Sequence, residues 1–152
     1  MYGLDYTINR FFSVYGPRMD CEGAYTEVIF NWLNQIHKGN NEITVFGNPD
    51  EKILDLVYVE DVVNAIILTT FNSNKDVFNV STQFGVSLTK LIEVIELVTG
   101  KHLKVNKLPE NRNDVENKRV GDTNKLKNLG WFDNTTIIGG IRKTNEWIAG
   151  LE

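Results

Sequence analysis

The sequence predicts an α/β protein built around a parallel β-sheet. In residues 6–17 and 54–59 the apolar residues follow one another with few interruptions, a pattern that suits a strand buried on both faces rather than a half-solvated one. Segments with apolar residues at helical spacing come after both, in residues 25–38 and 62–71. Because buried strands that alternate with amphipathic helices are typical of parallel sheets, we expect the first stretch to form a central strand.

The first predicted strand ends at a turn. Gly16 permits unusual backbone angles, and Pro17 fixes one angle and removes a hydrogen-bond donor, so the chain has to turn there. Ligands of open parallel sheets bind just outside the carboxyl ends of the strands. Residues 13–18 are therefore the first place where we expect a site.

The rest of the chain continues the alternation of strands and helices. Ser87 suits the amino-terminal cap of a helix that Gly100 ends, and the carboxylates of Glu60 and Asp61 suit the positive end of the helix that they begin. Further strands are expected at residues 43–47, 77–81 and 103–108, further helices at 122–129 and 136–151, and exposed polar loops at 48–52 and 109–119.

Length and composition limit the possible functions. The 152 residues suffice for a single domain over residues 1–152, and 20 acidic against 16 basic residues leave no basic surplus for nucleic acid or an anionic membrane. The pattern of a signal peptide and an apolar run long enough to span a bilayer are both missing, and the single Cys21 cannot form an internal disulfide. Two histidines without the spacing of ligands predict no metal site. We expect a cytoplasmic protein.

Three segments carry motifs that resemble those of one family. The first motif, residues 10–17, reads Arg-Phe-Phe-Ser-Val-Tyr-Gly-Pro. The second consists of a predicted strand that ends in a glycine, residues 43–47, followed by Leu-Asp-Leu-Val-Tyr-Val-Glu-Asp-Val-Val at residues 54–63. The third, residues 122–131, ends in Leu-Gly-Trp. In this order they resemble the extended short-chain dehydrogenase/reductases that act as NAD-dependent nucleotide-sugar epimerases and dehydratases, such as UDP-glucose 4-epimerase and dTDP-glucose 4,6-dehydratase. The likeness covers the carboxyl-terminal half of that family.

The resemblance implies a partial fold. The chain would hold the last strands of a doubly wound, Rossmann-like sheet together with a small α+β subdomain that binds the nucleotide-sugar, and the amino-terminal dinucleotide-binding half would be absent. The strands at residues 6–14 and 77–81 would then leave an unpaired apolar edge. We expect either a homo-oligomer across that edge or a companion amino-terminal half.

The resemblance also implies roles at the first strand. Phe11 and Phe12 would approach the nicotinamide of NAD, and Ser13 would contact the sugar or its phosphate. The chain departs from the family pattern at two positions. Ser13 replaces an asparagine and lacks the bidentate reach of an amide, and Leu54 stands where the family commonly has an arginine for the diphosphate.

The remaining implied site residues come from two further segments. Val45, Phe46 and Gly47 would lie beside the base of the nucleotide, although a plain strand explains the same residues. Arg112 and Asp114 match the family's second arginine motif with a gap of one residue, so Arg112 would bind the diphosphate, with Lys118 and Arg119 as the alternatives. A solvated run of charges explains this polar loop equally well.

Two motifs that catalysis requires in this family are absent from the sequence. It contains no Gly-x-Gly-x-x-Gly or Gly-x-x-Gly-x-x-Gly turn for a pyrophosphate, and no tyrosine has a lysine four residues later. We therefore expect neither tight NAD binding nor catalysis by this chain alone. It would be the substrate-binding portion for a UDP-, dTDP- or GDP-linked sugar. The alternative is a non-catalytic binding or self-association module derived from the same family.

Overall fold

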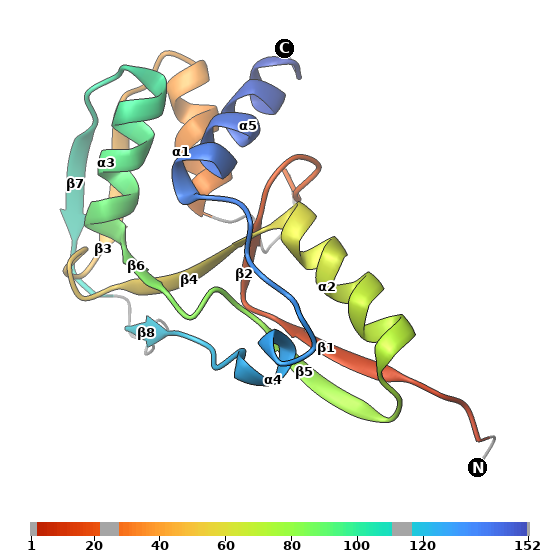
Figure 1. Ribbon diagram of the computed structural model, residues 1–152. Helices are drawn as coiled ribbons and strands as arrows, with labels where there is room; N and C mark the ends of the chain where they lie inside the picture. Colours follow the sequence, from red (N-terminus) through yellow and green to blue (C-terminus); the bar gives the residue numbers. More distant parts are fainter. Residues whose placement is uncertain (1–2, 22–27, 111–116, 152) are drawn as a thin grey trace.

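The computed structural model describes residues 3–21, 28–110 and 117–151 (Figure 1). Strands and helices alternate over much of this part of the chain. The strands are β1 (Thr7–Phe11), β2 (Ser13–Tyr15), β3 (Glu42–Phe46), β4 (Ile53–Tyr58), β5 (Asp76–Val80), β6 (Gly85–Ser87), β7 (Lys104–Leu108) and β8 (Lys118–Arg119). The helices are α1 (Val28–His37), α2 (Val59–Asn72), α3 (Leu88–Thr99), α4 (Asn124–Lys127) and α5 (Ile137–Ala149).

Parallel pairing dominates the sheets. β1 pairs with β5, β2 with β4 and β3 with β7, each time in parallel, which confirms the predicted parallel α/β arrangement. β4 also pairs with β6 in antiparallel and with β8 in parallel orientation. In Figure 1, β4 runs between a group formed by α1, α3, α5, β3 and β7 and a group formed by β1, β5, α2 and α4.

The stretch that we expected to form one central strand forms two strands instead. The chain changes partner at Phe12, whose backbone N–H donates to the carbonyl of Val80 at 3.1 Å, and continues beside β4. Burial on both faces was the wrong prediction for β1, since Ile8 is 47% and Phe11 50% exposed. The reason is that α2 covers the face of β1 that carries Asn9, whereas Ile8 lies on the opposite, exposed face. In addition, β5 pairs with one edge of β1, and no strand among the described residues pairs with the other edge. This open edge agrees with the unpaired edge that we expected.

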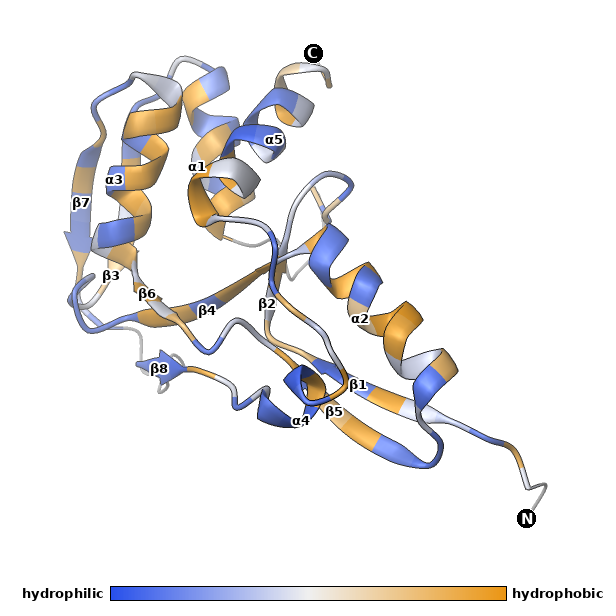
Figure 2. Ribbon diagram, viewed as in Figure 1, coloured by the Kyte–Doolittle hydropathy of each residue, from blue (hydrophilic) through white to orange (hydrophobic). Residues whose placement is uncertain are grey.

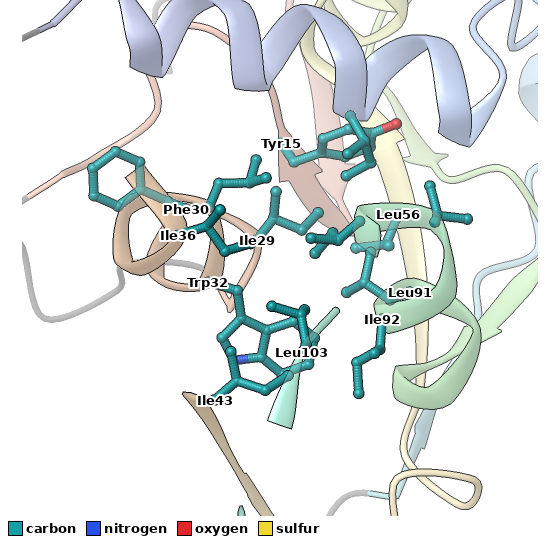
Figure 3. Packing of buried hydrophobic residues seen from close by; sticks show 14 of the residues in the cluster. Tyr15, Ile29, Phe30, Trp32, Ile36, Ile43, Leu56, Leu91, Ile92 and Leu103 are labelled. Atoms are coloured by element: carbon teal, nitrogen blue, oxygen red, sulfur yellow. The ribbon is translucent and has the colours of Figure 1, made fainter. Parts of the chain in front are cut away.

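Buried apolar side chains form two clusters. The larger cluster lies among α1, α3, α5 and the strands β2, β3 and β4, and Figure 3 shows Trp32, Ile43 and Leu103 packed together in it. The smaller cluster joins α2, β4 and β5 to α4 through Val57, Val62, Ala65, Phe78, Val80, Leu126 and Trp131. Each fully buried large apolar side chain contributes about 1.5–3 kcal/mol to the stability of the fold. The two clusters therefore hold the strands and helices together and, through them, position the loops between the strands.

The helix ends follow their local signals in most cases. α3 begins and ends as predicted, because the Ser87 hydroxyl accepts the Lys90 N–H at 3.1 Å and Gly100 closes the helix with φ 66°. α2 starts at Val59, directly after β4 and earlier than expected. Two predictions need correction, since α4 covers only part of the helix expected at residues 122–129, and β6 was not expected.

Asp55 in β4 fastens two loops to the sheet. Its carboxylate is fully buried, and Oδ1 accepts both the N–H and the hydroxyl of Thr82 at 2.7 Å. Oδ2 accepts the N–H groups of Gln83 at 3.2 Å and Gly121 at 3.1 Å. A buried carboxylate is stable only with such donors, so these four bonds fix the segment after β5 and the segment before α4 against β4.

Candidate functional site

The first cavity lies where the sequence predicted a site, beyond the carboxyl end of β2. It has a volume of about 510 Å³, and we call it the β2-end cavity. The backbone beside this cavity requires glycine at position 16, because this residue has φ 142° and an added Cβ would stand 2.5 Å from Cγ1 of Val59. The residues that line it are Phe12, Val14, Tyr15, Gly16, Pro17, Arg18, Met19, Asp20 and Val59.

Tyr15 contributes a phenol side chain to the lining of the β2-end cavity. Its ring is buried and meets the ring of Tyr58 edge-on, with the two centroids 5.6 Å apart. Burial, followed by the charges of Tyr58 and Asp61, raises the pKa of Tyr15 well above its ordinary value. The phenol therefore stays protonated near neutral pH and cannot serve as a general base there.

The two aromatic residues assigned to the nicotinamide end up in different surroundings. Phe12 lines the β2-end cavity and packs against the backbone of Gly121, where an added Cβ would stand 2.6 Å from its Cζ. Phe11 is exposed and does not belong to this lining. Ser13 pairs with Leu56 in the β2–β4 ladder and lines neither this cavity nor the one described next. Their roles toward cofactor and sugar stay predictions.

The second cavity lies between α1, β3 and the start of β4. It has a volume of about 290 Å³, and we call it the α1–β3 cavity. Val45 and Phe46 both line it, and Gly47 makes the turn that follows with φ 76°. The structure thus brings together the three residues that the resemblance places beside the base. The full lining consists of Val28, Trp32, Thr44, Val45, Phe46, Lys52, Ile53, Leu54, Leu88 and Asn117.

Lys52 in this lining was missed by the sequence analysis. We expected residues 48–52 to be an exposed loop, but Pro49 and Lys52 are both buried. The backbone carbonyl of Lys52 accepts the N–H of Leu88 at 3.0 Å, and its ammonium lies 3.3 Å from Oε1 of Glu110. The one signal in the sequence is that Lys52 directly precedes the apolar residues of β4, and this does not distinguish a buried lysine from an exposed one.

Arg112 and Asp114 lie outside the described residues, so their assignment to the diphosphate stays a prediction. The residues on either side of that segment lie near the α1–β3 cavity. Asn117 belongs to its lining, and Glu110 pairs with Lys52.

The carboxylates at the start of α2 have structural partners. The buried carboxylate of Asp61 accepts the N–H groups of Asn134 at 3.2 Å and Thr135 at 3.1 Å, which holds the segment before α5. Glu60 accepts a hydrogen bond from Lys143 at 2.9 Å, and this bond raises the pKa of the Lys143 ammonium. Both acids lie in the first turn of α2, as the sequence predicted.

Within residues 3–21, 28–110 and 117–151 no three acidic, histidine or cysteine side chains come together as ligands for a metal ion. None of the helices in this part of the chain combines the length and the apolar character that crossing a membrane requires.

Comparison with known proteins gives the chain a family. The model of the NAD dependent epimerase/dehydratase family matches residues 1–81. The UDP-glucuronate 4-epimerase of Thermodesulfobacterium geofontis is 26% identical over 97% of this chain and 44% of its own length. The putative UDP-glucose 4-epimerase of Methanocaldococcus jannaschii is 28% identical over 97% of this chain and 47% of its own length.

Solved structures match along the whole chain. The crystal structure of UDP-glucose 4-epimerase from Thermotoga maritima with UDP-glucose is 33% identical, with a TM-score of 0.90 over 99% of this chain and 48% of that one. The Thermus thermophilus UDP-glucose 4-epimerase complex with NAD is 28% identical, with a TM-score of 0.87 over 99% of this chain and 49% of that one. The chain thus spans about half the length of the relatives it matches, with parallel sheets that correspond to part of their Rossmann-type fold. This chain belongs to the NAD-dependent epimerase/dehydratase family.

Proposed function

We propose that this chain is the carboxyl-terminal, nucleotide-sugar-binding half of an NAD-dependent sugar epimerase or dehydratase. The observation that carries the proposal is the α1–β3 cavity, which combines apolar and aromatic walls with one buried ammonium. Such a cavity suits a ligand with a flat ring at one end and an anionic group at the other. The similarity to a structure that contains UDP-glucose supports a UDP-sugar as that ligand.

In this proposal the chain contributes one wall of the NAD-binding site and not the complete site. Phe12 and Val59 in the β2-end cavity are apolar and fit the flat nicotinamide ring. The sequence has no glycine-rich turn to hold a pyrophosphate and no tyrosine–lysine pair to act as base. In the proposed enzyme NAD supplies the oxidation at C4 of the sugar, and this chain binds and orients the nucleotide-sugar. The other half of the family fold supplies the dinucleotide site and the base.

A titration with nucleotide-sugars tests the binding proposal. The purified chain is titrated with UDP-, dTDP- and GDP-linked sugars by calorimetry, and its melting temperature is followed in parallel. Saturable binding to one class of nucleotide supports the proposal. If none of them binds or raises the melting temperature, the alternative remains, in which the chain is a binding or self-association module without affinity for these ligands.

Phe46→Ala is expected to weaken that binding by about tenfold. Phe46 lines the α1–β3 cavity and is 44% exposed, so its ring is accessible to a base and its loss costs little stability. Stacking of a base on an aromatic ring contributes about 1–3 kcal/mol. Calorimetry on the variant measures the change, with Phe71→Ala as the matched control, because Phe71 on α2 is 81% exposed and outside this cavity. Equal affinities for both variants would contradict the assignment of the cavity.

The face formed by α2 and the open edge of β1 is suited to binding a partner chain. The inner side of α2 packs on the sheet, where Asn9 of β1 donates to the hydroxyl of Thr69 at 3.0 Å. Figure 2 colours several segments of α2 as hydrophobic, and four of its apolar residues form an outer stripe that is exposed to solvent, namely Val63, Ile66, Ile67 and Phe71. An unpaired strand edge beside exposed apolar side chains favours association. We propose that the other half of the fold covers this face, and that a second copy covers it when the 152-residue chain is purified alone.

Ile67→Glu is expected to convert the purified chain from a dimer to a monomer. Ile67 is 52% exposed in the outer stripe of α2, and a carboxylate there would lose its hydration in an interface. Light scattering at tens of micromolar measures the mass. Leu97→Glu is the control, since Leu97 is an exposed apolar residue on α3. A wild-type chain that is monomeric at that concentration, or a dimer that survives Ile67→Glu, would rule out this interface.

A further inference from the structure

Lys52 and Glu110 form an ion pair whose two members differ sharply in exposure. Their charged atoms lie 3.3 Å apart, but the side chain of Lys52 is 7% exposed and that of Glu110 is 55% exposed. Lys52 lines the α1–β3 cavity, and Glu110 is not part of that lining. The cation is therefore built into the cavity wall, while its anion reaches it from the solvent side.

The surroundings hold Lys52 in place. Its backbone N–H donates to the carbonyl of Asn48 at 3.3 Å, and its carbonyl accepts the N–H of Leu88. The side chain passes close to Gly47, where an added Cβ would lie 3.5 Å from Cε of Lys52 and 3.6 Å from Oε1 of Glu110. Gly47 thus leaves the space through which the ammonium and the carboxylate meet.

A buried ammonium requires an anion, and the identity of that anion is open to exchange. Removing one charge from water costs several kcal/mol unless an opposite charge compensates for it. Glu110 can return to water at little cost because it is more than half exposed. Lys52 cannot do so without leaving the wall of the cavity. A ligand anion that enters the α1–β3 cavity can therefore replace Glu110 as the partner of Lys52.

The lining decides which anion fits. Among the described residues of this cavity Lys52 is the only cation, and Trp32, Val45, Phe46 and Leu54 make the walls apolar or aromatic. A free inorganic anion would gain nothing from these walls. A nucleoside phosphate would place its base against them and its phosphate on the ammonium.

We propose that Lys52 is the diphosphate-binding residue of this chain and that Glu110 is a built-in counter-ion that the diphosphate displaces. The inference rests on the proposed function, because it assigns a residue to the phosphates of the same nucleotide-sugar. It makes Lys52 the residue that distinguishes a nucleotide from its nucleoside. Glu110 lowers the affinity for the nucleotide by competing for the same ammonium.

Calorimetric titrations with uridine and UDP test this assignment. In the wild-type chain UDP binds more tightly than uridine. Lys52→Met is expected to lower the affinity for UDP by at least tenfold, on the order of 1.4 kcal/mol, and to leave that for uridine unchanged. Glu110→Gln is expected to raise the affinity for UDP by about threefold or more, because one carboxylate that competes for the ammonium is gone. Increasing salt should weaken UDP binding to the wild type and have less effect on Lys52→Met.

Two controls keep the outcomes distinct. Lys90→Met removes an exposed lysine that pairs with Glu93 on α3 and should change neither affinity. Lys52→Arg keeps the charge and should retain the preference for UDP over uridine, which covers the case that Lys52→Met does not fold. Unchanged UDP binding by Lys52→Met and Glu110→Gln would overturn this inference and leave the proposed function standing. A wild-type chain that binds no nucleotide or nucleotide-sugar would overturn both.

Discussion

Asp55→Ala is expected to lower the free energy of unfolding by about 3–5 kcal/mol, because several hydrogen-bond donors lose a buried, charged acceptor at once. The buried carboxylate of Asp55 accepts the N–H groups of Thr82, Gln83 and Gly121 and the hydroxyl of Thr82. Without it these donors lose their partner where water reaches them poorly, at a cost of about 1–3 kcal/mol for each buried group left unpaired. Denaturant unfolding followed by circular dichroism measures the change.

Two further variants separate hydrogen bonding from volume. Asp55→Asn keeps the size of the side chain but presents an NH₂ group to backbone donors, so we expect a loss of about 2 kcal/mol. Asp5→Ala removes an exposed carboxylate that accepts one bond from Asn74, and the expected change is within about 0.5 kcal/mol. If Asp55→Ala were no more destabilising than Asp5→Ala, Asp55 would not fasten the loops to β4.

Gly140→Ala is expected to destabilise the protein by about 2 kcal/mol, although alanine is the better helix former by about 1 kcal/mol. Gly140 lies in α5 directly against Tyr15 of β2. An added Cβ would stand 2.8 Å from Cζ of Tyr15 and closer still to its hydroxyl oxygen. Tyr15 is buried and its ring packs against that of Tyr58, so the contact is relieved only if the Tyr15 ring or α5 shifts from its position. The midpoint of denaturant unfolding measures the effect.

The neighbouring glycine provides the matched control. At Gly139 an added Cβ meets only the hydroxyl oxygen of Thr136 at 3.2 Å, so Gly139→Ala should be neutral or stabilising. Tyr15→Phe removes the hydroxyl that Gly140→Ala would meet first. The penalty of Gly140→Ala should therefore be smaller in the Tyr15→Phe background, as a double-mutant cycle will show. Equal effects at the two glycines would mean that the contact with Tyr15 does not limit the packing of α5.

Much of the fold could be predicted because its signals are local. The cap at Ser87 and the stop at Gly100 act within one turn of α3, and both were confirmed. The apolar residues of β4 predicted a strand that the structure confirms at the junction of several others. The error at β1 has a physical cause, since apolar composition indicates that a strand can be buried and does not show how many partners bury it.

The candidate site could be predicted only in part. The turn at Gly16 and Pro17 predicted the position of the β2-end cavity, because the carboxyl ends of parallel strands are a general feature of the fold. Val45 and Phe46 line the α1–β3 cavity, and their place beside the base of a nucleotide stays a prediction. Lys52 was missed because a lysine in a polar loop gives no sign of burial, and the carboxylate that compensates it, Glu110, lies far along the sequence.

The sequence by itself determined most of the alternation of strands and helices, the parallel α/β class and the turn beyond β2, since periodicity, caps and glycine–proline turns depend on residues a few positions apart. The tertiary structure alone decided which polar groups are buried and which of them meet. Asp55 meets Gly121, Tyr15 meets Gly140, and Lys52 meets Glu110 across long stretches of chain. The charge and shape of the two cavities depend on these long-range contacts, which the folded chain creates and no local pattern encodes.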